Sequence, residues 1–111
     1  MYKQGSIVIV KFPFTDGSEF KKRPALVISN SKLDTLEDCL LVQITSKFSS
    51  DGLSIPINKE DSTKDLPLKS YVRPHKIFTI HKSLILSEIS QVNSTFLKMV
   101  SGKIFELIEV I

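Results

Sequence analysis

The sequence predicts a mainly β fold of the α+β class, a small barrel or sandwich followed by one C-terminal helix. Short β-branched segments recur along the first 81 residues, and Gly, Pro and polar clusters separate them. Beyond Asn93, apolar residues recur instead at helical spacing. At 111 residues the chain is long enough to bury one core, so we expect a single domain over residues 1–111.

The expected strands are bounded by turn signals. The first is the run SIVIVKF between Gly5 and Pro13, and the polar turn PFTDGSEFKK follows it. Polar connections over 30–37 and 58–65 separate later segments, and Pro74 is expected to interrupt the last one. The predicted strands cover residues 6–12, 24–29, 38–46 and 53–57, with one or two more inside 70–81.

The C-terminal segment NSTFLKMVSGKIFELIEVI has helical periodicity. Asn93 or Ser94 is suited to cap its first turn by accepting a hydrogen bond from a free backbone N–H. Gly102 inside it costs about 1 kcal/mol relative to Ala. One apolar stripe is expected to face the core: Leu97, Val100, Ile104, Leu107, Ile108 and Ile111.

Composition indicates a protein of the cytoplasm. Apolar residues make up 41% of the chain, and no apolar run reaches the roughly 18 residues of a membrane span. The N-terminus lacks the layout of a secretory signal. The single cysteine, Cys39, cannot form an internal disulfide and is expected to be a small buried hydrophobe.

Basic residues are unevenly distributed, although the net charge is only +3. Residues 69–82 contain four Lys or Arg and two His without a carboxylate, and Lys21, Lys22 and Arg23 form a second cluster. If both clusters share a face, they make a patch that attracts phosphates. The alternative is a set of scattered, solvated surface charges.

Motifs for nucleotide, dinucleotide or zinc chemistry are missing from the sequence. His75 and His81 have no cysteine or acid at ligand spacing, so neither a metal site nor a cofactor is expected. No GxSxG marks a nucleophile. What remains is a set of cations and hydroxyls at strand ends, which suits an anionic substrate: Arg23, Thr45, Ser46, Ser70 and Arg73.

Four segments, FPFTD, KKRPALVIS, VQITS and SYVRPHKIFTI, resemble the PemK/MazF-like toxins of bacterial toxin-antitoxin systems. The resemblance runs from Gly5 to about Ile80, and RPALVIS is its most specific element. It implies an SH3-like β-barrel with appended helices, a homodimer, a cognate antitoxin, and contact with DNA through the antitoxin complex. It also implies metal-independent cleavage of single-stranded RNA, such as mRNA, at a short motif, leaving a 2',3'-cyclic phosphate and a 5'-OH.

The resemblance also implies a set of catalytic residues. Arg23 and Thr45 occupy the positions of the family's catalytic arginine and threonine, where a guanidinium would hold the phosphate and a hydroxyl would donate to it. Arg73 matches an arginine of another branch, in which the residue two positions on is often an aspartate. Here that residue is His75. Because imidazole titrates at about pH 6.5, we hypothesise that His75 is the base; the alternative is a surface imidazole.

Further contacts to RNA are expected at Glu19, Lys22, Ser46, Ser70 and Lys76. Three aromatic residues near the first turn, Phe12, Phe14 and Phe20, could stack on bases or anchor the core. Two other functions are open, a non-enzymatic inhibitor of the same fold that binds DNA gyrase, and an inactive relative that binds only RNA or antitoxin. The pairing of Arg23 with Thr45 favours an enzyme.

Overall fold

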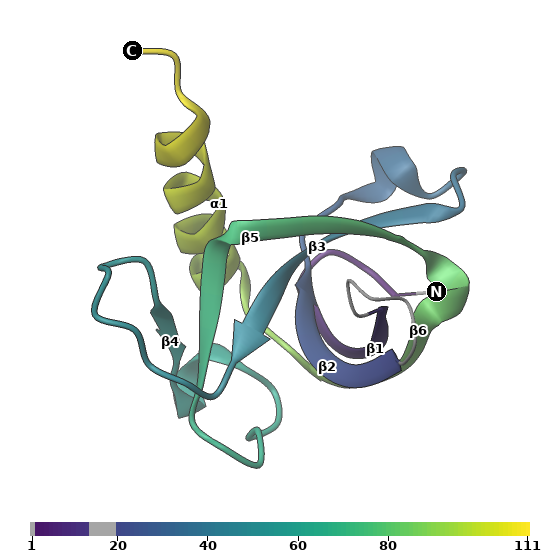
Figure 1. The fold of residues 1–111 in the computed structure, drawn as a ribbon, viewed down its shortest axis with the longest axis horizontal. Helices are drawn as coiled ribbons and strands as arrows, with labels where there is room; N and C mark the ends of the chain where they lie inside the picture. The colour runs from purple at the N-terminus through teal and green to yellow at the C-terminus, as the bar shows by residue number, and fades with distance from the viewer. Residues whose placement is uncertain (1, 14–19) are drawn as a thin grey trace.

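The computed structural model describes residues 2–13 and 20–111. They form one antiparallel sheet with a helix packed beside it (Figure 1). Along the sheet the strand order is β4-β5-β3-β2-β1-β6. The elements are β1 (Ser6–Pro13), β2 (Phe20–Val27), β3 (Asp38–Thr45), β4 (Ile55–Ile57), β5 (Ser70–His81), β6 (Ile85–Gln91) and α1 (Ser94–Ile108).

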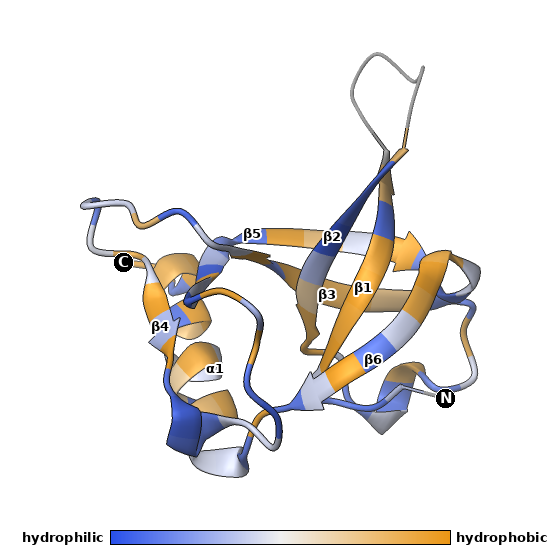
Figure 2. Cartoon of the chain, turned by 90° about the horizontal axis from the view of Figure 1, so that it is seen from below, coloured by the Kyte–Doolittle hydropathy of each residue, from blue (hydrophilic) through white to orange (hydrophobic). Residues whose placement is uncertain are grey.

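The sheet is strongly curled (Figure 1), and most of β1 is hydrophobic (Figure 2). Side chains on both faces of the sheet are buried. Successive side chains of a strand point to opposite faces, and both Ile7 and Val8 of β1 are 0% exposed. One core lies between the sheet and α1 and contains Ile7, Leu26, Val42, Ile44, Ile55, Val72, Val92, Phe96 and Val100. The other lies inside the curl and contains Val8, Val10, Ala25, Val27, Cys39, Leu41, Ile80 and Ile85.

This architecture confirms the predicted mainly β class with a C-terminal helix. The sheet curls without closing, since β4 and β6 are its two edges. The buried, unpaired Cys39 is also as predicted. In the described part of the chain no helix has the length and apolar character needed to cross a membrane.

The last predicted strand segment is a single strand, β5, of 12 residues. Its register against β3 jumps from Val42↔Ile77 to Gln43↔Arg73, so residues 74–76 form a bulge, and the predicted interruption at Pro74 is confirmed. The sixth strand is instead β6, ILSEISQ, which sequence reasoning missed. It lies at a sheet edge and exposes Leu86, Ser87 and Glu88 in succession, so it lacks the alternation that signals a strand.

Helix α1 begins after Asn93, whose side chain accepts a hydrogen bond from the Phe96 N–H at 2.8 Å. The predicted stripe is correct for Val100, which is buried. It is wrong for Leu107 and Ile108, which are exposed, because the helix runs past the edge of the sheet (Figure 1). The predicted stripe residue Ile111 is fully exposed and lies beyond the helix end.

Candidate active site

Strand register places Arg23, Thr45 and Arg73 on one face of the sheet. Ala25 of β2 pairs with Gln43 of β3, and Gln43 pairs with Arg73 of β5. Arg23 precedes Ala25 by two residues and Thr45 follows Gln43 by two, and residues two apart in a strand share a face. Three residues far apart in the sequence therefore project from neighbouring strands in the same direction.

A cleft of about 460 Å³ opens beside these strand ends. Arg23, Thr45 and Ser46 line it together with Ser70 of β5 and Lys47. Apolar residues complete its wall: Ile9, Pro24, Ile44, Leu66, Leu68 and Ile89. Four residues selected from the sequence thus meet around one open, cationic depression that has an apolar lining.

The polar groups of Arg23 and Thr45 remain available at this cleft. Arg23 is exposed, and within the described part of the chain no group is hydrogen-bonded to its guanidinium. The Oγ1 of Thr45 accepts the Lys47 N–H at 3.1 Å, which leaves the hydroxyl proton free to be donated. A guanidinium and a hydroxyl donor at one cleft are groups that can donate hydrogen bonds to a phosphate.

Ser46 and Ser70 have different surroundings. Ser46 is exposed at the cleft. Ser70 is only 7% exposed, and its hydroxyl donates to the Leu68 carbonyl at 2.9 Å. Ser70 therefore holds the segment that carries Leu68 against the cleft, while its oxygen can still accept a hydrogen bond.

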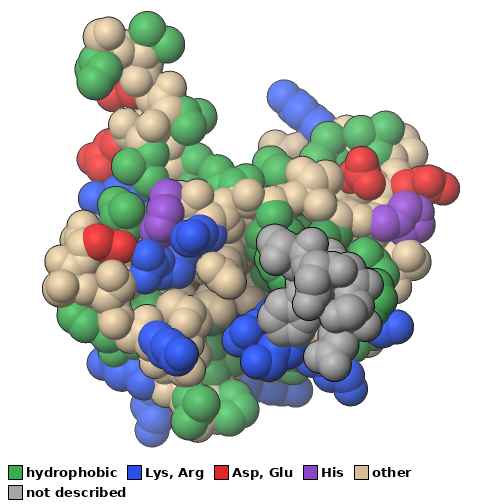
Figure 3. Space-filling view, in the orientation of Figure 1, with side chains coloured by type: hydrophobic (Ala, Val, Ile, Leu, Met, Phe, Trp, Pro, Cys, Tyr) green, Lys and Arg blue, Asp and Glu red, His purple; other side chains and the backbone are tan. Residues whose placement is uncertain are grey.

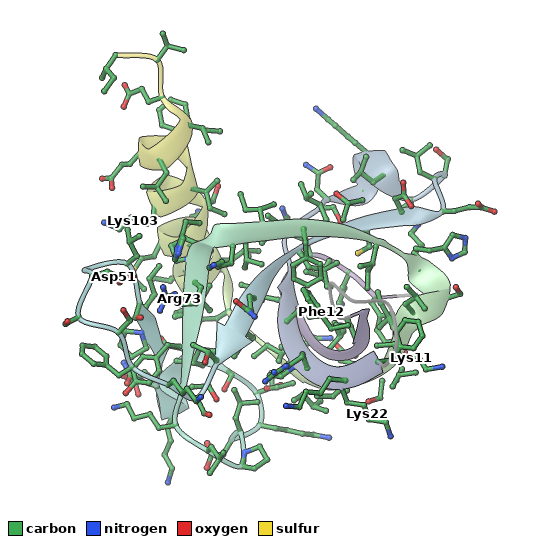
Figure 4. All side chains as sticks on the ribbon, in the orientation of Figure 1. Lys11, Phe12, Lys22, Asp51, Arg73 and Lys103 are labelled. Atoms are coloured by element: carbon green, nitrogen blue, oxygen red, sulfur yellow. The ribbon has the colours of Figure 1, made fainter. Side chains whose placement is uncertain are left out.

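Arg73 and His75 lie outside the cleft lining and form a second cluster with Asp51, from the segment between β3 and β4 (Figure 4). The Nη2 of Arg73 donates to Oδ2 of Asp51 at 2.8 Å and lies 3.3 Å from Nε2 of His75. This contact brings Arg73 and His75 together despite the bulge at Pro74.

Sequence reasoning missed Asp51, because its partner is 22 residues away and the loop around it has no distinctive motif. The Leu53 N–H, more than the Ser49 hydroxyl or the charge of Arg73, lowers the pKa of Asp51 below its ordinary value of 3.8, against the opposing effect of burial. Asp51 is therefore ionised at neutral pH.

A second missed residue is Phe48, which is 68% exposed. Its ring packs edge-on against Tyr71, with 5.6 Å between the ring centroids, and Tyr71 pairs with Thr45 across β3 and β5. The aromatic residues named from the sequence fit stacking less well. Phe12 is half-buried against Phe78 with 5.1 Å between centroids, and Phe14 lies outside the described residues. Phe20 is the exception: it is 58% exposed, and Nζ of Lys11 lies 5.5 Å from the centroid of its ring.

The remaining predicted contacts are distributed more widely. Lys22 pairs with Lys11 on β1, its side chain points away from the Arg23 face, and it does not line the cleft (Figure 4). Lys76 is exposed in the bulge of β5, and Glu19 lies outside the described residues. In Figure 3, most of the visible Lys and Arg side chains lie in the lower half of the view. Within residues 2–13 and 20–111, no three His, Cys, Asp or Glu side chains are grouped as metal ligands would be.

Comparison with known proteins identifies the family. The sequence profile of the PemK-like, MazF-like toxins of type II toxin-antitoxin systems matches residues 3–108. The chain therefore belongs to this family of toxins. No curated protein matches the sequence at a significant level.

Solved structures share the fold at low sequence identity. An endoribonuclease in complex with its cognate antitoxin, from a mycobacterial species, has a TM-score of 0.80 at 15% identity, covering 100% of this chain and 98% of that one. A MazE-MazF complex from Deinococcus radiodurans has a TM-score of 0.81 at 18% identity, covering 99% and 97%. The toxin MazF-mt6 of Mycobacterium tuberculosis has a TM-score of 0.75 at 17% identity, covering 96% and 98%.

Proposed function

We propose that this toxin is a metal-independent endoribonuclease that cleaves single-stranded RNA by attack of the 2'-OH on the adjacent phosphate. The observation that carries the proposal is the meeting of the Arg23 guanidinium, which has no hydrogen-bond partner among the described residues, and the Thr45 hydroxyl at one open cleft. Two of the proteins that share its fold are named as endoribonucleases.

The roles follow from the charge that develops during the reaction. As the 2'-oxygen attacks phosphorus, the phosphate oxygens gain negative charge, which a fixed guanidinium and a hydroxyl donor stabilise. Arg23 holds two phosphate oxygens and Thr45 donates a hydrogen bond to the same phosphate. His75 is assigned the 2'-OH proton, since Arg23 and Arg73 remain protonated and cannot take it. Because His75 lies outside the cleft lining, this assignment requires the ribose at the cut to extend from the cleft to the cluster of Asp51, Arg73 and His75. The apolar lining and the exposed Phe48 suit the faces of the flanking bases.

An assay of the cut ends tests this chemistry. Purified protein is incubated with a long single-stranded RNA in EDTA, and both ends of each product are mapped. We expect cleavage to continue and to leave a 2',3'-cyclic phosphate or its 3'-phosphate product together with a 5'-OH. Activity that is lost on chelation and restored by Mg²⁺ would contradict the mechanism, and intact RNA would favour a non-enzymatic inhibitor.

We also propose that the chain forms a homodimer. Its support in this structure is the apolar end of α1, where Phe105 is 61% and Ile108 is 66% exposed. Burying such side chains against a second copy removes apolar surface from water. Sedimentation at micromolar concentration should show a dimer, and Ile108→Asp should shift it toward monomer; a fully active wild-type monomer would contradict the proposal.

A cognate antitoxin is the second proposed protein partner, in line with the antitoxin complexes among the structures of the same fold. An antitoxin segment that covers Arg23 should be acidic, because carboxylates would neutralise the cleft and exclude phosphate. We expect this protein to contact DNA only as part of the complex with its antitoxin. Addition of such an acidic segment should inhibit cleavage, with weaker inhibition as salt increases.

A further inference from the structure

Arg73 is held by a carboxylate and is not open to an anion. Besides the 2.8 Å bond to Asp51, its Nη1 lies 3.5 Å from the Ser54 hydroxyl, and its side chain is only 14% exposed. The other oxygen of Asp51, Oδ1, accepts the Leu53 N–H at 2.9 Å. One oxygen of Asp51 thus fixes the loop and the other fixes the guanidinium, so a phosphate would have to displace Asp51 to bind Arg73.

The imidazole of His75 lies next to this ion pair. A guanidinium can only donate, so Nε2 of His75 accepts from Nη2 of Arg73 and carries no proton in this contact. At 3.3 Å the contact is longer than the bond between Arg73 and Asp51, so the lone pair of Nε2 is held only weakly.

Proton uptake by His75 would place a second positive charge beside Arg73. A neighbouring cation disfavours the imidazolium, whereas a neighbouring carboxylate favours it. The charged groups of this cluster are Asp51 and Arg73, and Lys76 follows His75 on β5. Helix α1, which packs on β5, carries Lys103 and Glu106, but these two side chains form an ion pair with each other at 3.4 Å. Asp51 is the anion that contacts Arg73 beside His75.

We propose that Asp51 is a positioning residue, which fixes Arg73 and balances its charge so that His75 can accept the proton of the attacking 2'-OH. The inference rests on the proposed function. In the step, the 2'-oxygen bonds to phosphorus, the bond from phosphorus to the 5'-oxygen breaks, the 2'-OH proton passes to Nε2 of His75, and the leaving 5'-oxygen takes a proton from water. Arg73 acts through His75, and Arg23 binds the phosphate.

The variant Asp51→Asn tests this role, because it keeps the size of the side chain and an acceptor for the Leu53 N–H. On a short RNA we expect kcat to fall about tenfold, part of the roughly 10²–10⁴ that a general base supplies, with little change in KM. The acidic limb of the pH-rate profile should move to lower pH, since the imidazolium loses a favourable charge. Asp51→Glu should restore much of the rate.

Two further variants separate this role from a general structural effect. The double variant Asp51→Asn/His75→Ala should be no slower than His75→Ala alone, because both changes remove the same step. Glu37→Gln is the matched control. It breaks a carboxylate–imidazole pair of 3.3 Å with His81, at the other end of β5, and should leave the rate and the pH profile unchanged. Thermal unfolding of each variant shows whether it is folded.

An unchanged pH profile in a folded Asp51→Asn protein overturns the proposal. So does tighter RNA binding with faster cleavage, which would show that Arg73 binds the phosphate and Asp51 competes with it. NMR of the His75 ring without RNA adds a readout that does not need activity: the chemical shift of Nε2 should change in Asp51→Asn, because Arg73 loses the carboxylate that fixes it beside His75. An unchanged chemical shift also overturns the proposal. A wild-type protein that leaves RNA intact would refute the proposed function, while the chemical shift still decides whether Asp51 positions Arg73 against His75.

Discussion

Replacing Arg23 by Ala should separate catalysis from stability. Arg23 is exposed, and within the described residues nothing is hydrogen-bonded to its guanidinium. Surface substitutions of this kind change the free energy of unfolding by no more than about 0.5 kcal/mol. The folded state of Arg23→Ala should therefore be as stable as the wild type.

The rate of RNA cleavage should respond very differently. Loss of one donor that stabilises transition-state charge lowers kcat by about 10²–10³, which corresponds to about 2.7–4 kcal/mol. Arg23→Lys keeps the charge but loses the planar pair of donors, so its rate should lie between those of Arg23→Ala and the wild type. Lys98→Ala, on the exposed side of α1, changes the net charge equally and should retain the wild-type rate.

A fluorogenic single-stranded RNA under single-turnover conditions gives the rate, and urea denaturation gives the stability. The expected pattern is a large loss of rate at an unchanged denaturation midpoint for Arg23→Ala. A folded Arg23→Ala protein that cuts RNA at the wild-type rate would refute the proposed role of the cleft. A large loss of stability would instead show that Arg23 has a structural part that its exposure does not reveal.

Four other outcomes are expected. In His75→Asp the acidic limb of the pH-rate profile should move or vanish while RNA affinity stays near normal, and an unchanged limb and rate in His75→Ala would exclude His75 from the chemistry. Phe48→Ala should weaken binding of a non-cleavable RNA analogue by 1–3 kcal/mol, about the loss of one stacked base, as measured by fluorescence anisotropy. Replacing Phe96, which is 1% exposed, by Ala should lower the free energy of unfolding by about 3–5 kcal/mol. Replacing the half-exposed Met99 on the same helix by Ala should lower it far less. The pKa of Asp51 is lowered in the folded state, so its ionised form stabilises the fold at pH values above the ordinary pKa of 3.8. This stabilisation is lost as the pH falls below that value. The Asp51→Asn protein, measured by urea denaturation, should therefore lose less stability in acid than the wild type.

Local sequence patterns predicted most of the secondary structure. The runs that became β1, β2 and β3 are short, β-branched and bounded by turn residues, so their propensity and their buried role agree. Pro74 predicted a break in the ladder because it has no N–H to donate. The edge strand β6 was missed because three successive residues, Leu86, Ser87 and Glu88, are exposed, so the segment lacks the apolar/polar alternation of a half-buried strand.

The site could be predicted only in part. Arg23, Thr45, Ser46 and Ser70, which line one cleft, could be selected from the sequence because cations and hydroxyls at strand ends stand out beside apolar runs. Arg23 and Thr45 also resemble a family motif. Asp51 and Phe48 lie in a polar loop without a motif, and their importance depends on Arg73 and Tyr71, which are more than 20 residues away. No local pattern records a contact over that distance.

The sequence by itself determined the mainly β class, the start of the C-terminal helix at Asn93 or Ser94, the buried single cysteine and the family. These follow from propensity, capping and motif, which are properties of neighbouring residues. Tertiary structure alone decided that Arg23 and Thr45 line one cleft, that Arg73 is held by Asp51, and that the end of α1 runs past the sheet and exposes Ile108. Those features depend on strand register and on where one element ends relative to another. Register is fixed by the packing of both cores together, so it exists only in the folded chain.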